Sequence, residues 1–165
     1  FATEAMIQGL NTVFQARAYA DFELMPPERK EKVIPFIAQW CQGARTRTAA
    51  EAMRALAQVF AMREAAVNAT EPHDFLIAPT SPITAYDAEE ACPGNDPATA
   101  MNHLCFTAPF NMSEQPAASV CAGYDEDGLP IGLQIIGLRF DDVGVLRLAA
   151  AYEEMRPALK PWPQP

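Results

Sequence analysis

The sequence has few basic residues, few serines and histidines, and no long hydrophobic run. Twelve Lys and Arg residues stand against 21 Asp and Glu residues, which gives a formal net charge of −9. This balance argues against nucleic acid and anionic membrane as partners, because both attract basic surfaces. The longest nearly uninterrupted apolar run, LPIGLQIIGL at 129–138, is about half as long as a bilayer-spanning helix. We therefore expect a protein that binds neither nucleic acid nor membrane.

The cysteines and histidines are too sparse and too widely spaced for a metal or redox site. No two of the four cysteines lie closer than 13 residues, and there are two histidines. Zinc sites and redox pairs favour short spacings such as C-x2-C. No secretory leader is visible at the start of the chain, so we expect free, mostly buried thiols in a reducing cytoplasm. A disulfide stays open as an alternative, and neither a metal nor a cofactor is expected.

Motifs that carry a catalytic nucleophile or a nucleotide are also missing. Ser113 lies in NMSEQ and Ser119 in AASVC, and neither has the flanking glycines of a G-x-S-x-G nucleophile elbow. The glycines do not form G-x-G-x-x-G, and there is no Walker loop. A catalytic triad of Ser113, His103 and Glu114 could be proposed from residue types alone, but other such triads could be assembled equally well by chance. We therefore expect no catalytic residue within this chain.

The residues that are present describe an ordinary globular domain with helices in its first half. Half of the 165 residues are hydrophobic and 20% are charged. Apolar spacing predicts helices over 3–24 and 48–69, the second opened by the capping box TAAE at 48–51. Along that second helix, apolar residues recur at Met53, Leu56, Phe60 and Val67. A helix from PPER at 26–29 to Gln42 is expected to kink or split at Pro35.

The second half predicts strands, proline-rich loops and a final helix. Short apolar runs favour strands at about 74–78, 118–124 and 130–137, with the turn DEDG joining the last two as an antiparallel hairpin. Seven prolines between 72 and 116 indicate irregular backbone there. A helix starting at Asp141 or Asp142 should end before Pro157. The fold class is therefore α/β, with a few mixed or antiparallel strands covered by about four helices.

Two features suggest that this chain is part of a larger unit. The strands would keep an open edge, which is a liability unless more chain covers it. The chain also begins with Phe1, inside a sequence that already reads as helix. We expect a single portion, 1–165, that is helical over 1–73 and contains strands, loops and the final helix over 74–165.

Four sequence blocks resemble the C-terminal third of amidase signature enzymes. They are DFLIAPTSPITA at 74–85 and, within 106–154, the blocks FNMSEQPAASVCAG, GLPIGLQIIG and DDVGVLRLAAAYEE. The order and spacing follow the family pattern, and the similarity is looser over 1–73. The resemblance implies hydrolysis of a carboxylic amide to acid and ammonia or amine by a Ser–cisSer–Lys acyl-enzyme mechanism. The trio lies upstream in the family and matches no position here, so we expect this chain to be inactive alone.

The resemblance also implies the partners and the candidate site residues. The expected partners are the N-terminal part of the same amidase and a small-molecule amide, and a homodimer is an open alternative. By resemblance Thr80, Ser81, Phe110 and Asn111 are candidate substrate-binding residues. For Asn111 and for Gln134, the competing interpretation is that the amides satisfy buried backbone groups. For Thr80 and Ser81, it is that each side chain stabilises a turn.

The sequence departs from the family pattern at Glu114, where glycine is usual, and at Cys121, where proline is frequent. Glu114 implies a changed turn or a carboxylate aimed at something, so we expect it to help select a polar or cationic substrate group. The segment HLCFTAPFN lacks the carboxylate expected in a glutamine-using amidotransferase subunit. This favours an ordinary amidase. Alternatives are a non-catalytic, amidase-derived binding or scaffold module and an independent serine or cysteine hydrolase.

Overall fold

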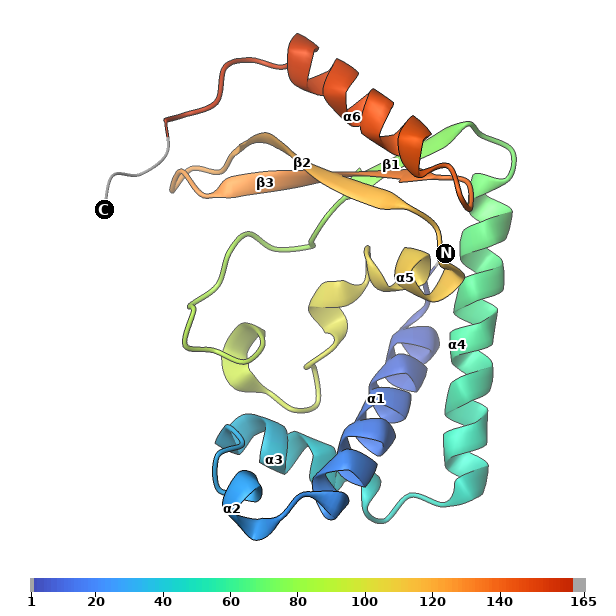
Figure 1. Cartoon of the computed structure of the whole chain (residues 1–165), viewed down its shortest axis with the longest axis vertical. Coiled ribbons are helices and arrows are strands. Elements are labelled where there is room, and N and C mark those ends of the chain that lie inside the picture. The colour runs from blue at the N-terminus through green and yellow to red at the C-terminus, as the bar shows by residue number, and fades with distance from the viewer. Residues whose placement is uncertain (1, 162–165) are drawn as a thin grey trace.

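The computed structural model describes residues 2–161 and shows an α/β arrangement. A three-stranded sheet lies at one end of the molecule and a group of helices lies at the other (Figure 1). The long helix α4 runs from the helical end up to the sheet. The elements are α1 (Glu4–Leu24), α2 (Pro27–Lys30), α3 (Pro35–Cys41), α4 (Ala49–Thr70), β1 (Phe75–Pro79), α5 (Ala108–Ser113), β2 (Ala117–Tyr124), β3 (Pro130–Gly137) and α6 (Asp142–Met155). The expected fold class is confirmed.

The sheet has the order β1-β3-β2, and both pairings are antiparallel. The expected hairpin joins β2 to β3, and Gly128 in its turn takes a φ of 83°. On one face of β3, Ile136 packs with Ala66 of α4 and Phe110 of α5. On the other face, Ile135 packs with Val145 of α6. Both faces of the central strand are therefore covered by helices, as its unbroken apolar sequence predicts.

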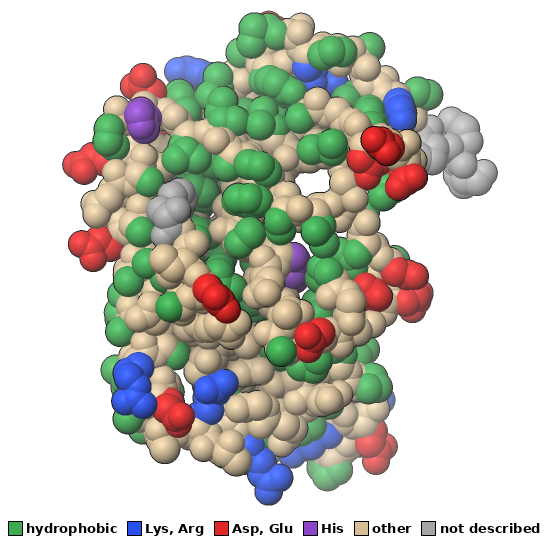
Figure 2. Space-filling view, turned by 180° about the vertical axis from the view of Figure 1, so that it is seen from behind, with side chains coloured by type: hydrophobic (Ala, Val, Ile, Leu, Met, Phe, Trp, Pro, Cys, Tyr) green, Lys and Arg blue, Asp and Glu red, His purple; other side chains and the backbone are tan. Residues whose placement is uncertain are grey.

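The outer strands of this sheet keep open edges within residues 2–161. β1 and β2 each pair with β3 and with no other strand of the described chain. Ile77, in the middle of β1, leaves 59% of its surface exposed. Seen from behind, hydrophobic side chains gather over the part of the molecule that contains the sheet (Figure 2). The expected open edge is confirmed, and no helix of the described residues is long and apolar enough to cross a membrane.

The helix boundaries follow the capping signals of the sequence. At the start of α4, the Thr48 hydroxyl accepts from Glu51 N, and the Glu51 carboxylate accepts from Thr48 N at 2.7 Å. This is the predicted capping box. The Asp141 carboxylate accepts from Gly144 N at the start of α6. Pro35 separates α2 from α3, because proline is tolerated in a first helical turn but not inside a helix.

Helix α4 buries a different stripe from the apolar one that marks it in the sequence. Met53 and Phe60 are 63% and 58% exposed. The buried residues are Ala55, Val59, Met62, Ala66 and Thr70. Gly9 of α1 allows the two helices to approach closely at this face, since a Cβ on Gly9 would lie 2.9 Å from the Ala55 carbonyl oxygen. Periodicity locates the helix, whereas the fit against α1 decides which face is buried.

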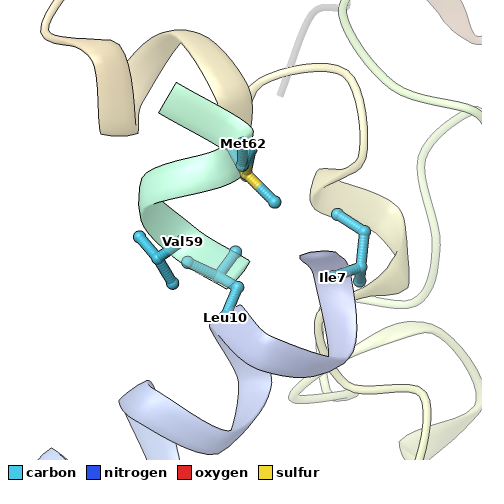
Figure 3. Close-up of a cluster of buried hydrophobic side chains, with 5 residues drawn as sticks. Ile7, Leu10, Val59 and Met62 are labelled. Atoms are coloured by element: carbon cyan, nitrogen blue, oxygen red, sulfur yellow. The ribbon is translucent and has the colours of Figure 1, made fainter. Parts of the chain in front are cut away.

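Ile7 and Leu10 of α1 meet Val59 and Met62 of α4 in a hydrophobic cluster (Figure 3). All four side chains are buried, and Met62 is completely so. Burying a side chain of this size contributes about 1.5–3 kcal/mol relative to leaving it exposed. The α1–α4 contact is thus one of the apolar clusters that stabilise the helical part of the molecule.

Helix α5 was not expected, because the proline-rich region 72–116 predicts irregular backbone. Its six residues are too few to be stable in isolation. Pro109 occupies the first turn of α5, where its missing N–H is harmless. Ala108, Pro109, Phe110 and Ser113 are buried, so tertiary packing holds this turn of helix. The prediction of irregular backbone was wrong for these residues.

A buried carboxamide, that of Gln115, ties α4, α5 and β3 together. Its Nε2 donates to Thr70 Oγ1 at 2.8 Å and to the Gly137 carbonyl oxygen at 3.0 Å. Its Oε1 accepts from the Ser113 hydroxyl at 2.7 Å. Thr70 Oγ1 donates in turn to the Ala66 carbonyl oxygen. These polar groups are buried and hydrogen-bonded to one another, so the network costs little desolvation while it fixes three elements.

Gln115→Leu should lower the free energy of unfolding by about 2–3 kcal/mol, because it leaves the buried Gly137 carbonyl without its donor. The measurement is urea denaturation of the chain followed by circular dichroism. Gln8→Leu, at an exposed position of α1, is the control and should change stability by less than about 0.5 kcal/mol. A Gln115→Leu loss as small as that of the control would contradict the role of this network.

The capping box predicts a pH-dependent contribution from Glu51. The Thr48 backbone N–H, and then its hydroxyl, hydrogen-bond the Glu51 carboxylate and lower its pKa. A lowered pKa means that the stabilisation is present in neutral solution and is lost as the pH falls through the folded-state pKa. Glu51→Gln should therefore destabilise the chain at pH 7, and the difference should shrink below about pH 4. Thermal unfolding at several pH values tests this, with Glu64→Gln on the same helix as the control.

Candidate functional site

Thr80 and Ser81 lie together at the edge of a cavity of about 500 Å³. The cavity is lined by 80–86, which follow β1, and by 130–132, which begin β3. β1 ends just before Thr80, where Pro79 and Pro82 bracket the turn into the loop. The antiparallel pairing of β1 with β3 brings these two segments together, although about 50 residues separate them along the chain. The structure therefore places two of the five candidate residues at one cavity.

A hydroxyl pair spans the central strand beside this cavity. Thr80 N donates to the Gly132 carbonyl oxygen at 3.0 Å, which continues the β1–β3 ladder by one residue. Thr80 Oγ1 and Ser119 Oγ lie 2.7 Å apart, although they belong to segments on opposite sides of β3. They meet because Gly132 has no side chain: a Cβ there would lie 2.7 Å from Thr80 Oγ1 and 3.0 Å from Ser119 Oγ.

Ser119 and Gly132 were not among the expected site residues. Their positions in the sequence show only that one is polar and the other small. Their proximity follows from the strand order and register, in which Ser119 lies opposite Gln134 of β3. An exposed hydroxyl in an otherwise apolar strand is the one signal that could have marked Ser119.

Phe110 belongs to a different cavity, of about 390 Å³. This second cavity is lined mainly by 76–79, Cys105, Phe106 and Phe110. Phe110 is 2% exposed and packs against Ile136 and Ala66, so it also serves the core. An apolar cavity next to an open strand edge is suited to an uncharged group.

The side-chain amide of Gln134 is buried, whereas that of Asn111 is exposed. Gln134 Nε2 donates to the Phe106 carbonyl oxygen at 2.9 Å, so it satisfies a backbone group as expected. This bond fixes the segment that leads into α5. Asn111 is exposed on α5 and lines neither of the two cavities. The interpretation of a buried amide therefore holds for Gln134 and not for Asn111.

Glu114 ends α5 in the left-handed conformation, with φ 61° and ψ 31°. This is the conformation that glycine adopts most easily, which accounts for glycine as the usual residue in the family pattern. The Glu114 carboxylate forms ion pairs with Arg63 of α4, at 3.3 Å, and with Arg139 after β3. The Glu114 carboxylate is thus paired with two guanidinium groups of this chain, and its expected role in selecting a substrate group stays a prediction.

The serines do not form a nucleophilic site within residues 2–161. Ser113 is 1% exposed, and its oxygen lies 3.1 Å from the Phe110 carbonyl oxygen and 2.7 Å from Gln115 Oε1. In this part of the chain no lysine or histidine side chain is hydrogen-bonded to Ser81, Ser113 or Ser119. A serine nucleophile requires such a base. Within residues 2–161, neither Ser113 nor Ser119 therefore has the hydrogen-bonded base that a serine nucleophile requires.

Two of the four cysteines, Cys41 and Cys92, are buried. All four are free thiols. Burial raises the pKa of the Cys41 and Cys92 thiols, so both stay protonated at neutral pH. Over residues 2–161 there is no group of three or more His, Cys, Asp or Glu side chains that could hold a metal ion.

Comparison with known sequences identifies one family. A sequence profile of the Amidase family matches residues 6–146. A glutamyl-tRNA(Gln) amidotransferase subunit from Thermodesulfovibrio yellowstonii is 43% identical over 89 residues, which are 54% of this chain and 18% of that protein. The corresponding subunit of Myxococcus xanthus is 40% identical over 92 residues, 56% of this chain and 18% of that protein. The match thus spans less than a fifth of the length of these curated relatives.

Comparison with solved structures shows the same fold over nearly the whole chain. A crystal structure described as an amidase has a TM-score of 0.76 at 22% identity and covers 93% of this chain and 36% of its own. A bacterial aryl acylamidase of the amidase signature family has a TM-score of 0.72 at 21% identity, covering 90% and 33%. A 6-aminohexanoate cyclic dimer hydrolase has a TM-score of 0.71 at 22% identity, covering 94% and 36%. The chain therefore corresponds to about a third of these enzymes.

Glu114→Gln should remove the two ion pairs and lower stability by at most about 1 kcal/mol at low salt, because the Glu114 side chain is 52% exposed. In about 1 M salt the difference should vanish, since exposed pairs are screened. Glu114→Gly loses the same pairs but relieves the left-handed backbone, so it should be at least as stable as Glu114→Gln. Thermal melts at low and high salt measure both, with Glu126→Gln as control. A Glu114→Gly variant less stable than Glu114→Gln would contradict this account.

Proposed function

The chain belongs to the amidase signature family, and on this basis we propose that it forms the C-terminal third of an enzyme that hydrolyses carboxylic amides. Residues 1–165 would be a single portion of the amidase domain. The catalytic serines and the lysine would lie in the remainder of the domain, and the chain by itself would be inactive. The proposal is supported by the profile match over 6–146 and by the partial coverage of the solved amidases.

The observation that carries this proposal is the cavity formed by 80–86 and 130–132. These segments overlap two of the family-like blocks, DFLIAPTSPITA and GLPIGLQIIG, which lie far apart in the sequence. Polar groups meet there at the end of a strand, beside an apolar wall formed in part by Ile83, Tyr86 and Ile131. Ligand sites commonly combine an apolar cavity with a few convergent polar groups. We assign Thr80 and Ser81 to the substrate side of this cavity and Phe110 to the second one.

The chemistry implied by the family is acyl transfer. A serine hydroxyl would attack the amide carbonyl, and the lysine would accept its proton by way of the second serine. Backbone amides would stabilise the oxyanion, and the leaving amine would take up a proton. Water would then hydrolyse the acyl-serine ester to the free acid. This chain would contribute the substrate cavity and part of the supporting sheet.

The open sheet edges favour the remainder of the amidase domain as the partner of this chain. The unpaired backbone groups along an edge strand are satisfied when another strand pairs with them. The exposed apolar residue Ile77 and the second cavity lie along the β1 edge, where such pairing would cover them. We therefore propose that β1 is the strand that continues the sheet into the rest of the enzyme.

Two other functions have specific support. The curated relatives are glutamyl-tRNA(Gln) amidotransferase subunits, which supports an ammonia-supplying role as an alternative to the ordinary amidase that HLCFTAPFN indicates. A non-catalytic scaffold module is favoured by the absence of a nucleophile–base pair in residues 2–161. Hydrolysis confined to glutamine and dependent on partner proteins would establish the first. Absence of a catalytic Ser–Ser–Lys trio from the full-length protein that contains this chain would establish the second.

The full-length protein that contains this chain should release ammonia from small primary amides, whereas residues 1–165 alone should release none. A fluorophosphonate probe should label a serine of the full-length protein that lies outside these 165 residues, as located by mass spectrometry. Purified chain 1–165, treated in the same way, serves as the control sample. Labelling of Ser81, Ser113 or Ser119, or ammonia release by the chain alone, would refute the proposal.

A further inference from the structure

The hydroxyl pair of Thr80 and Ser119 has a geometry that a turn alone does not require. Hydroxyls from segments flanking β3 on both sides meet over Gly132 at 2.7 Å. The Thr80 backbone is already held by its N–H bond to the Gly132 carbonyl oxygen. The side-chain contact therefore adds a second restraint, and this one fixes the direction of the Thr80 hydroxyl.

The two hydroxyls share one hydrogen bond and hold two hydrogens. Whichever group donates, one hydrogen stays available for another acceptor. Thr80 lines the cavity of 80–86 and 130–132, whereas Ser119 does not. If Ser119 donates to Thr80, the Thr80 hydrogen is left to point toward a group in the cavity. Ser119 is thus placed to orient Thr80, although it does not itself line the cavity.

The lining of this cavity contains no charged side chain. Its ten residues are threonines, serine, prolines, isoleucines, alanine, tyrosine and glycine, in a chain that has 12 basic and 21 acidic residues. The adjacent carboxylate, Asp87, accepts from Glu89 N at 3.0 Å within its own loop. Lys160 lies over the Tyr124 ring, near the turn of the hairpin. A charged ligand group placed in the cavity would lose water without gaining a counter-charge, which is unfavourable.

We propose that this cavity binds an uncharged, mainly apolar amide, that Thr80 hydrogen-bonds its polar atom, and that Ser119 is the residue that positions Thr80. The proposal rests on the proposed function and extends it, because it names the class of substrate and a residue that the sequence did not mark. It requires Gly132, since any side chain there would separate the two hydroxyls. It also assigns no substrate contact to Glu114, whose carboxylate pairs with Arg63 and Arg139.

The test is binding of benzamide to the 165-residue chain. Binding is monitored by NMR through the backbone amide resonances of the isotope-labelled protein. Benzamide should shift resonances of 80–81, 83–86 and 131–132. Benzamidinium and benzoate have the same shape with a positive and a negative charge, and they should bind at least about tenfold more weakly. Thr80→Val and Ser119→Ala should each weaken benzamide binding by about five- to tenfold, the effect of one lost hydrogen bond.

Two further variants separate positioning from general damage. Thr46→Val removes an exposed hydroxyl that belongs neither to the pair nor to the cavity lining, so it should leave benzamide affinity within about twofold. Ser119→Thr keeps the hydroxyl and should restore affinity that Ser119→Ala loses. The melting temperature of each variant shows whether it folds. If Ser119→Ala proves unfolded, the comparison of benzamide affinity between Thr80→Val and Thr46→Val decides.

Equal affinity for benzamide and its charged analogues would overturn the assignment of the cavity to uncharged groups. Unchanged affinity in Ser119→Ala or Thr80→Val would overturn the roles of these hydroxyls, as would resonance shifts confined to other regions. These results are independent of hydrolysis. A full-length protein that binds benzamide through Thr80 but releases no ammonia from any amide refutes the proposed function and leaves the binding assignment standing.

Discussion

The carboxamide of Gln115 is the interaction on which the arrangement of this chain depends. It bonds to the end of α4 through Thr70, to α5 through Ser113 and to β3 through Gly137. Ile136 also packs in an apolar cluster with Ala66 of α4 and Phe110 of α5. Apolar packing is non-directional and tolerates small shifts, whereas these hydrogen bonds allow one relative placement. The sheet is thereby fixed on α4, and the strand ends that form the substrate-side cavity are fixed with it.

Local signals in the sequence were sufficient for most of the elements. The Thr48–Glu51 capping box, the Asp141 cap and the apolar runs of β2 and β3 each report a short-range preference, and the structure follows them. The exposed face of α4 and the short helix α5 were missed for one reason. Both depend on which residues pack against them. The positions of Gly9 and Phe110 in the sequence do not show that Gly9 contacts α4 or that Phe110 is buried. Sequence reasoning was reliable where neighbours along the chain decide the outcome.

The same division applies to the candidate site. Thr80 and Ser81 could be named because they lie within a family-like block, and they do border a cavity. Ser119 and Gly132 could not be named, because their relation to Thr80 exists only once β1 and β2 flank β3 in the observed register. Glu114 shows the converse. A departure from the family pattern drew attention to its carboxylate, and the structure explains the departure by two nearby arginines that offset an unfavourable backbone conformation.

The order of the strands also has a kinetic consequence. β2 and β3 are joined by a tight turn, with Tyr124 opposite Pro130, whereas the partners Phe75 and Gly137 of β1 and β3 lie 62 residues apart along the chain. Closing a long loop costs more conformational entropy than closing a hairpin, so contacts between distant segments form late in folding. The β2–β3 hairpin is therefore expected to form first, and β1 is expected to pair with it later. The cavity beside Thr80 would be among the last parts of the molecule to acquire its shape and among the first to lose it.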